Sequence, residues 1–396
     1  MIIAGSRRPN PHRMKIDFDR IPSPCFVLDE ELLRINLEIL HLVQQEAGVD
    51  ILCALKGYAM WSTFPLIGKY LSGATASSLH EARLVYEEMG CEAHTYAPVF
   101  YGEEFDEVLR YSSHIVFNSL SQFERFKNRV AGCGKAVSMG LRINPEYSEV
   151  ETDLYNPAIP GSRLGIVREQ LGDKLPEGID GLHFHVLCEN DSHVLERTLE
   201  RVEGSFASLI HQARWFNMGG GHHITREDYD VNHLVKLLKG FKARYPRLEK
   251  VILEPGEAIG WQTGYLVSTV QDIVENKGIR VAMLDVSFAA HMPDCLEMPY
   301  KPRILNATGA TPGKPVYRMG GGTCLAGDYM GMGDYSFDRE LNIGDRVIFD
   351  DMMHYTMVKT TYFNGVMHPA IGIFRETGHF ELLRQFSYED YKGKLS

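Results

Sequence analysis

The sequence lacks a long hydrophobic run. No stretch reaches the roughly eighteen apolar residues that a membrane-spanning helix needs. The opening residues MIIAGSRRPNPHRMK contain arginines but not the apolar core of a secretion signal. We therefore expect a cytoplasmic protein with no membrane partner, whose natural start is Met14 and whose residues 1–13 form a disordered leader.

Cysteines are few and irregularly placed. There are seven, an odd number, and no two are spaced as CxxC. A disulfide framework and a zinc knuckle both need paired cysteines at characteristic spacings. The sequence therefore predicts neither, and a reducing compartment suits it.

Positive charge is in deficit. The 41 Lys and Arg residues face 52 Asp and Glu residues, which gives a formal net charge of -11. This balance disfavours nucleic acid or an anionic membrane as a partner and favours a cationic ligand. Solubility alone is the alternative explanation.

Between residues 50 and 255 the sequence repeatedly alternates short apolar segments with longer amphipathic ones. This alternation is typical of βα units around a parallel sheet. Capping-box spacing places helix starts at Ser78, with Glu81, and at Ser121, with Glu124, and Gly90 suits a helix C-terminus. The eight expected strands are 51–56, 73–77, 93–98, 114–119, 136–144, 181–186, 214–220 and 250–255.

Eight such units predict an α/β fold with a (β/α)8 barrel over residues 30–258. After about residue 260, short strands and turn residues predict a mostly antiparallel β-barrel domain. It would comprise residues 259–396 together with 14–29, where the segment FVLD adds a strand. Active sites of such α/β barrels lie at the carboxyl ends of the strands, so the residues that close each strand are the candidates.

Two charged residues close apolar strands: Lys56 the first and Glu254 the eighth. A buried charge needs a partner or a chemical task. The partner of Glu254 could be an arginine or a protonated pyridine nitrogen. Three glycines at 219–221 end the seventh strand, where backbone N–H groups can hold an anion, or where a tight turn simply needs glycine.

A histidine pair, His183 and His185, points to one face of the sixth strand because side chains alternate along a strand. HxH spacing can bind a metal, but one ring can equally stack on a planar cofactor while the other is structural.

Lys56, the glycine turn and Glu254 together meet the needs of pyridoxal phosphate: an amine for its aldehyde, donors for its phosphate and a carboxylate for its ring nitrogen. We therefore predict this cofactor and assign no metal.

The chain also resembles a known family over nearly its whole length from about residue 20. The strings PSPCFVLD, ALKGY, ATASSLHEARL, HFHV, MGGGH, EPGEA, GGTCLAGD and HYTMV occur in the order found in the alanine racemase-like, fold-type III pyridoxal-phosphate decarboxylases. That family includes ornithine and diaminopimelate decarboxylases. The cofactor contacts that the resemblance implies are Lys56, His185, Gly219, Gly220, Gly221, Glu254 and Tyr355.

In these roles Lys56 binds the cofactor covalently, His185 stacks on its ring, Glu254 pairs with the ring nitrogen, and the glycines and Tyr355 hold the phosphate. Cys324 matches the family's cysteine that reaches the substrate from a second subunit. The resemblance therefore implies a homodimer with shared active sites, in which Cys324 or Lys56 protonates the product carbon.

Within the family, the strings LDVSFAAHMPDCLEMPYKP and HVLCEN are most similar to members that convert carboxynorspermidine and carboxyspermidine to norspermidine and spermidine in polyamine biosynthesis. For the amines of such a substrate we nominate Glu257, Asp294 and Asp328. Asp328 could instead cap a turn, and Glu257 could form a surface pair. Glu257 replaces an arginine of ornithine decarboxylases, and residues 187–189 replace their GSG, so phosphate contacts differ in detail.

Several alternatives remain open at this point. Ornithine, lysine or diaminopimelate could be the substrate, and a racemase would need a tyrosine base in the region where Cys324 falls. A barrel metal-dependent hydrolase could use the HFH string and Glu254, but its HxH would precede the lysine rather than follow it. A non-catalytic pyridoxal-phosphate carrier would have no second domain.

Overall fold

The computed structural model describes residues 16–396, so the expected leader at 1–13 and the start at Met14 lie outside the described residues. The chain divides into two compact units, one holding Asn36–Ile259 and the other Gly260–Ser396 with the segment up to Ile35. Within the described residues no helix is both long and apolar enough to cross a membrane.

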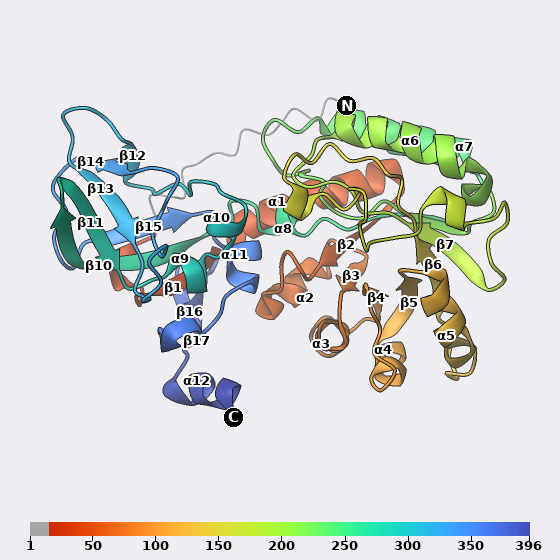
Figure 1. The fold of residues 1–396 in the computed structure, drawn as a ribbon, viewed down its shortest axis with the longest axis horizontal. Coiled ribbons are helices and arrows are strands. Elements are labelled where there is room, and N and C mark those ends of the chain that lie inside the picture. Colours follow the sequence, from red (N-terminus) through yellow and green to blue (C-terminus); the bar gives the residue numbers. More distant parts are fainter. Residues whose placement is uncertain (1–15) are drawn as a thin grey trace. The chain divides into compact units, whose positions relative to one another are not determined.

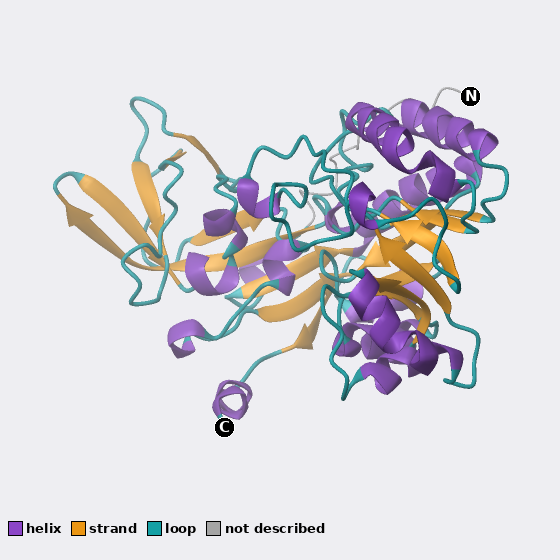
Figure 2. Cartoon of the chain, turned by 45° about the vertical axis from the view of Figure 1, so that its right-hand side comes forward, coloured by secondary structure: helices purple, strands orange, loops and turns teal. Residues whose placement is uncertain are grey.

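The first unit is a closed barrel of eight parallel strands in chain order, which confirms the expected (β/α)8 architecture (Figure 1). Helices lie outside the strands, as Figure 2 shows in purple around orange. The strands are β2 (Asp50–Ala54), β3 (Gly73–Ala76), β4 (Ala93–Tyr96), β5 (Ser112–Phe117), β6 (Ser138–Arg142), β7 (Ile179–His183), β8 (Trp215–Asn217) and β9 (Lys250–Leu253).

Most strands are shorter than their apolar segments suggested. The expected strand 214–220 pairs only over Trp215–Asn217, because the glycines that follow turn the chain out of the ladder. Helices of this unit are α1 (Glu30–Ala47, which begins in the other unit), α2 (Phe64–Ile67), α3 (Leu79–Leu84), α4 (Phe105–Arg110), α5 (Leu120–Ala131), α6 (Ser192–Ile210), α7 (Val231–Arg244) and α8 (Glu257–Gly260).

Helix starts test the capping predictions. Ser78 caps α3 and accepts the Glu81 N–H, and Gly90 has φ 73° at the end of the π-helical turn that extends this helix, both as predicted. The cap at Ser121 is wrong. Ser119 caps α5 instead and accepts the N–H of Gln122, because a serine with glutamine three residues on fits the same box two positions earlier.

Side chains fill the barrel below the strand ends. Trp215 is 4% exposed and packs with Leu52, Val116 and Ile252. Its indole occupies the space where a Cβ at Gly181 would lie, 2.0 Å from the nearest ring atom. The barrel interior is therefore a packed core, and only the carboxyl ends of the strands are free for chemistry.

The second unit is built on a nine-stranded sheet with the order β12-β14-β13-β11-β10-β1-β16-β17 and with β15 also paired to β10. The pairs β1–β16 and β11–β13 are parallel and the other pairings are antiparallel, so the sheet is mixed. The segment FVLD lies in β1, as expected. This open order from β12 to β17 replaces the expected β-barrel.

Its strands are β1 (Cys25–Asp29), β10 (Gly264–Asn276), β11 (Ile279–Leu284), β12 (Ala307–Gly309), β13 (Val316–Gly320), β14 (Tyr335–Phe337), β15 (Arg346–Asp350), β16 (Ala370–Phe374) and β17 (Phe380–Arg384). Its helices are α9 (Phe288–His291), α10 (Asp294–Glu297), α11 (Tyr355–Val358) and α12 (Tyr388–Leu395).

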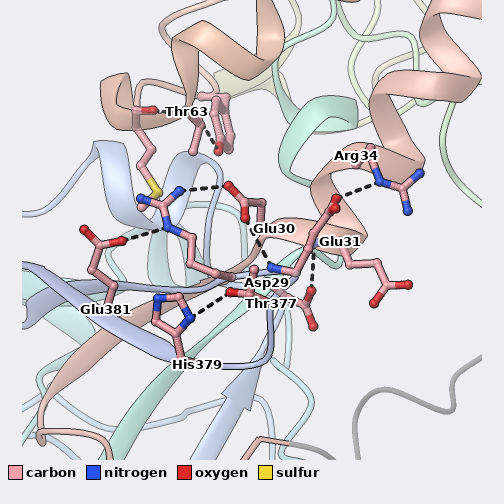
Figure 3. A network of polar contacts seen from close by, with 12 residues as sticks. Asp29, Glu30, Glu31, Arg34, Thr63, Thr377, His379 and Glu381 are labelled. Atoms are coloured by element: carbon pink, nitrogen blue, oxygen red, sulfur yellow. Dashed lines mark hydrogen bonds and ion pairs between the residues drawn. The ribbon is translucent and has the colours of Figure 1, made fainter.

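A polar network ties the start of α1 to the turn between β16 and β17 (Figure 3). Arg375 Nη1 lies 2.8 Å from Glu30 Oε1, and its Nε lies 2.8 Å from Glu381 Oε2. Arg34 Nε adds a contact of 2.7 Å to Glu376 Oε1. Arg375 therefore links the start of α1, which directly follows β1, to the hairpin of β16 and β17.

Candidate active site

The amine of Lys56 lies at the carboxyl end of the barrel. The strand β2 ends at Ala54, and Lys56 stands in the turn that follows. Its Nζ lies 3.0 Å from Nε2 of His185, which comes just after β7. The other ring nitrogen of His185, Nδ1, accepts the Gly220 N–H at 2.7 Å. Three different strand ends therefore converge on one amine.

The surroundings of this amine disfavour positive charge. Although Lys56 is an exposed residue, the protein around its amine displaces water and lowers its pKa, and the Arg142 guanidinium lowers it further. The charge of Glu254 raises the pKa of Lys56, but the net shift of this pKa is downward. Burial, then Lys56 and Arg142, hold the pKa of His185 well below its usual range. Both groups are therefore biased toward their neutral forms.

Glu254 follows β9 and is held by two neighbours. Its Oε1 accepts the Asn217 amide at 2.6 Å, and its Oε2 lies 3.5 Å from Nε2 of His183. Burial raises the pKa of Glu254, but contacts with His183 and Asn217 and the charge of Lys56 outweigh it, so the net shift is downward. The carboxylate is thus ionised and in place to accept a hydrogen bond from a cationic group.

The three glycines form a crowded turn against neighbouring strand ends. A Cβ at Gly220 would lie 2.4 Å from the Glu254 carbonyl oxygen, and Gly219 and Gly221 have φ angles of 68° and 83°. The Gly219 N–H is used by Asn217 Oδ1 and the Gly220 N–H by His185. Among the described residues no acceptor takes the Gly221 N–H. Of the three glycine N–H groups expected to bind an anion, only that of Gly221 is therefore available in this turn.

Arg142 and Asn217 are site residues that sequence reasoning missed. Arg142 closes β6, is 4% exposed, donates from Nη2 to the His185 carbonyl at 2.9 Å and lies over the Tyr96 ring at 4.7 Å. Asn217 closes β8 and joins Glu254 to Gly219. Both are polar residues at the end of apolar strands, which is the same pattern that identified Lys56 and Glu254.

The acidic candidates differ in their present contacts. Glu257 opens α8 in the barrel unit. In the sheet unit, Asp294 pairs with Lys359 at 2.8 Å. The carboxylate of Asp328 accepts the Ala289 N–H and both the N–H and hydroxyl of Thr323, which is the turn-capping arrangement considered as its alternative.

Two further predicted residues belong to the sheet unit. Cys324 is exposed in the loop after β13, where its N–H donates to Asn364 at 2.8 Å. Exposed apolar side chains surround it in sequence, namely Leu325, Tyr329 and Met332. Tyr355 opens the short helix α11. The structure thus brings Lys56, His185, the glycines and Glu254 together in one unit and places these two residues in the other.

The barrel residues fit pyridoxal phosphate. An amine biased toward its neutral form is the nucleophile that an aldehyde needs, and an ionised carboxylate suits a protonated ring nitrogen. Only glycine fits at position 220, because a Cβ there would lie 2.4 Å from the Glu254 carbonyl oxygen, and the turn it permits leaves the Gly221 N–H available to an anion. Lys56, His185, Gly221 and Glu254 are the groups that would hold it.

Comparison with known proteins agrees with this fit. A family model described as pyridoxal-dependent decarboxylase, C-terminal sheet domain, matches residues 25–353. A carboxyaminopropylagmatine decarboxylase of Synechocystis is 52% identical over 375 residues, covering 95% of this chain and 96% of the relative. A carboxynorspermidine/carboxyspermidine decarboxylase of Campylobacter jejuni is 43% identical over 385 residues, covering 94% and 98%.

A solved structure gives the same picture. The crystal structure of carboxynorspermidine decarboxylase complexed with norspermidine, from Campylobacter jejuni, superposes with a TM-score of 0.86 at 42% identity, covering 94% of this chain and 100% of that one. Diaminopimelate decarboxylase from Helicobacter pylori, at 16% identity and a TM-score of 0.75, shares the fold.

Proposed function

This chain belongs to the pyridoxal-dependent decarboxylases, and we propose that it removes the carboxylate of a carboxylated polyamine with pyridoxal phosphate as cofactor. The observation that carries the proposal is the contact of Lys56 with His185 at the barrel's carboxyl end, where Glu254 is held by Asn217 and lies beside His183. The proposal is also supported by two relatives, 52% and 43% identical to this chain, that are named as decarboxylases of carboxylated polyamines.

When bound, pyridoxal phosphate supplies a ring that accepts the electron pair left behind as carbon dioxide departs. Lys56 offers the amine that captures the aldehyde, and His185 offers a flat ring beside that amine. Glu254 would stabilise a proton on the ring nitrogen, because an ionised carboxylate favours a cationic partner. Gly221, with Gly219 and Gly220 shaping the turn, receives the phosphate.

The substrates named by the relatives share a carboxylated aminopropyl end and differ at the far end. Carboxynorspermidine and carboxyspermidine end in an amine, whereas carboxyaminopropylagmatine ends in a guanidinium. Both far ends are cationic and need anionic partners, for which Glu257, Asp294 and Asp328 are the candidates. Asp294 now pairs with Lys359 and Asp328 with Thr323, so binding the substrate would exchange these contacts.

The test is carbon dioxide release from a panel: the three carboxylated polyamines, ornithine, lysine and diaminopimelate. We expect kcat/KM for at least one polyamine to exceed that for every amino acid by about 100-fold, since unpaired polar groups in a site cost that much or more. The Lys56→Ala enzyme is the control and should release none. An amino acid as best substrate would overturn the substrate assignment while leaving the decarboxylase family intact.

We further propose that the enzyme is a homodimer in which Cys324 serves the partner's site. The apolar residues Leu325, Tyr329 and Met332 in the Cys324 loop are exposed in the single chain, and a second subunit would bury them. Mixing Lys56→Ala and Cys324→Ala proteins should restore activity that neither has alone, because one hybrid site then has both residues. Failure of mixed subunits to recover activity, despite exchange shown by a tag, would contradict the shared site.

A further inference from the structure

A second group of chemically active side chains lies away from the Lys56 site. His193 and Glu196 belong to the first turns of α6, and His233 belongs to the first turn of α7. One ligand atom from each of the three lies within 4.8 Å of the others. Two imidazoles and a carboxylate from two helices form a donor set that suits zinc and similar ions.

The backbone fixes both histidines. Asp191 caps α6 and accepts the His193 N–H at 3.0 Å, and Asp230 caps α7 and accepts the His233 N–H at 2.8 Å. Glu196 is three residues after His193, so the two share one face of α6. Both histidines therefore start from anchored positions at neighbouring helix ends.

A chain of hydrogen bonds sets the tautomer of His233. The Ser192 hydroxyl donates to the Asp230 carbonyl at 3.2 Å, so its oxygen is the acceptor for Nδ1–H of His233 at 2.9 Å. A neutral His233 then has its lone pair on Nε2. Such a bond at the second ring nitrogen is the usual support for a metal-bound histidine.

That lone pair faces a carboxylate. Nε2 of His233 lies 3.3 Å from Oε2 of Glu196. Two electron-rich atoms at this distance repel unless a cation or a proton lies between them. Two ligands at about 2.1 Å from one tetrahedral ion would be about 3.4 Å apart, so the pair already has the spacing of two zinc ligands.

Access and charge also suit an ion. The Glu196 side chain is 47% exposed and that of His233 is 19% exposed, so solvent reaches the cluster. The His193 ring stacks on the His233 ring at 4.1 Å between centroids, and as an exposed side chain it can turn to complete the set. Helix N-termini carry partial positive charge, which opposes a cation, but Asp191 and Asp230 sit on those ends and offset it.

We propose that His193, Glu196 and His233 bind one zinc-type divalent transition ion, with water at the fourth position. The ion would join the first turns of α6 and α7. The loop from β7 to α6 contains His185, and the loop from β8 to α7 contains the glycine turn. The two loops are joined by a hydrogen bond, in which the Asn190 N–H donates to the Gly221 carbonyl at 3.0 Å. Metal binding would therefore steady the backbone around the cofactor site from outside. This inference does not rest on the proposed substrate.

The test uses the holoenzyme, because bound cofactor keeps the probe ion away from the histidines of the barrel site. The probe is Zn²⁺ or Co²⁺ alone. Calorimetry should show one ion per chain, and Co²⁺ should give visible absorption of a low-coordinate site. The His193→Ala and Glu196→Gln variants should bind at least about ten-fold more weakly. His80→Ala, an exposed histidine in the first turn of α3, is the matched control and should bind as wild type does.

The glutamine variant keeps the shape of Glu196, so unchanged circular dichroism and cofactor absorption would exclude loss of folding as the cause of weaker binding. If the wild type binds no ion, or if neither substitution weakens binding, the site does not exist.

Discussion

The Nζ atom of Lys56 lies 3.0 Å from Nε2 of His185, while Nδ1 of the same ring accepts the Gly220 N–H. A neutral imidazole carries a single N–H, and an acceptor role for Nδ1 places that hydrogen on Nε2. Lys56 must then accept a hydrogen bond, which an amine can do and an ammonium cannot. The geometry therefore holds Lys56 in the form that attacks an aldehyde.

The first prediction concerns the pH at which the apoenzyme takes up pyridoxal phosphate. His185→Phe keeps a flat ring but removes the N–H that Lys56 accepts, so the pKa of Lys56 should rise. We expect the midpoint of the uptake rate to move up by about one pH unit, which slows uptake at pH 7 about ten-fold. Absorbance stopped-flow across pH measures it, and an unmoved midpoint would contradict the tautomer assignment.

The second prediction concerns the charge of Glu254. Glu254→Gln keeps the oxygen that Asn217 binds but loses the negative charge, so a protonated ring nitrogen is no longer favoured. Decarboxylation should fall about 100-fold or more in kcat, in the range seen when one electrostatic contact to developing charge is lost, while cofactor remains bound. Glu254→Asp, which keeps the charge, should lose less. Comparable kcat values for the glutamine variant and wild type would rule this role out.

The third prediction concerns the glycine turn. Gly220→Ala places a methyl group 2.4 Å from the Glu254 carbonyl oxygen, so the backbone must move and the cofactor should bind at least about ten-fold more weakly. Gly204→Ala in α6, where nothing lies within 4 Å of the added carbon, is the matched control and should bind cofactor normally. Equilibrium dialysis against pyridoxal phosphate measures both. Equal affinities would show that the turn tolerates the shift.

The fourth prediction concerns stability in acid. His114 on β5 stacks on His94 at 3.7 Å between ring centroids, and burial, with the charge of Lys250, lowers its pKa to about 4 despite Asp180 and Asp50 nearby. In the unfolded chain it titrates near 6.5, so between these values only the unfolded chain takes up the proton. The stability this contributes is present above pH 6.5 and is lost as the pH falls toward 4, on the order of 3 kcal/mol.

The measurement is the melting temperature between pH 7 and pH 4. His114→Gln cannot take up this proton, so its melting temperature should fall less steeply with acid than that of wild type, even if packing loss lowers it at pH 7. His80→Gln, an exposed histidine, should follow the wild-type slope. A wild-type slope in His114→Gln would mean that other groups dominate acid unfolding.

The sequence predicted the barrel because each strand is a short apolar segment followed by an amphipathic helix, a local pattern. It also predicted that Lys56, His185 and Glu254 meet, because carboxyl ends of barrel strands share one edge. Arg142 and Asn217 also end apolar strands, but both lay inside the strands expected at 136–144 and 214–220, so they were not recognised as strand-end residues. The parallel pairing of β1 with β16 was also hidden, because these strands are far apart in sequence and local patterns do not encode their register.

Trp215 packs with Leu52, Val116 and Ile252 inside the barrel, so no channel runs along the barrel axis. A molecule bound at the carboxyl ends of the strands cannot pass through the barrel to the amino ends. The product must therefore leave from the same end of the strands at which the substrate was bound. A product that is still bound at the carboxyl ends of the strands therefore competes with the next substrate for the same place.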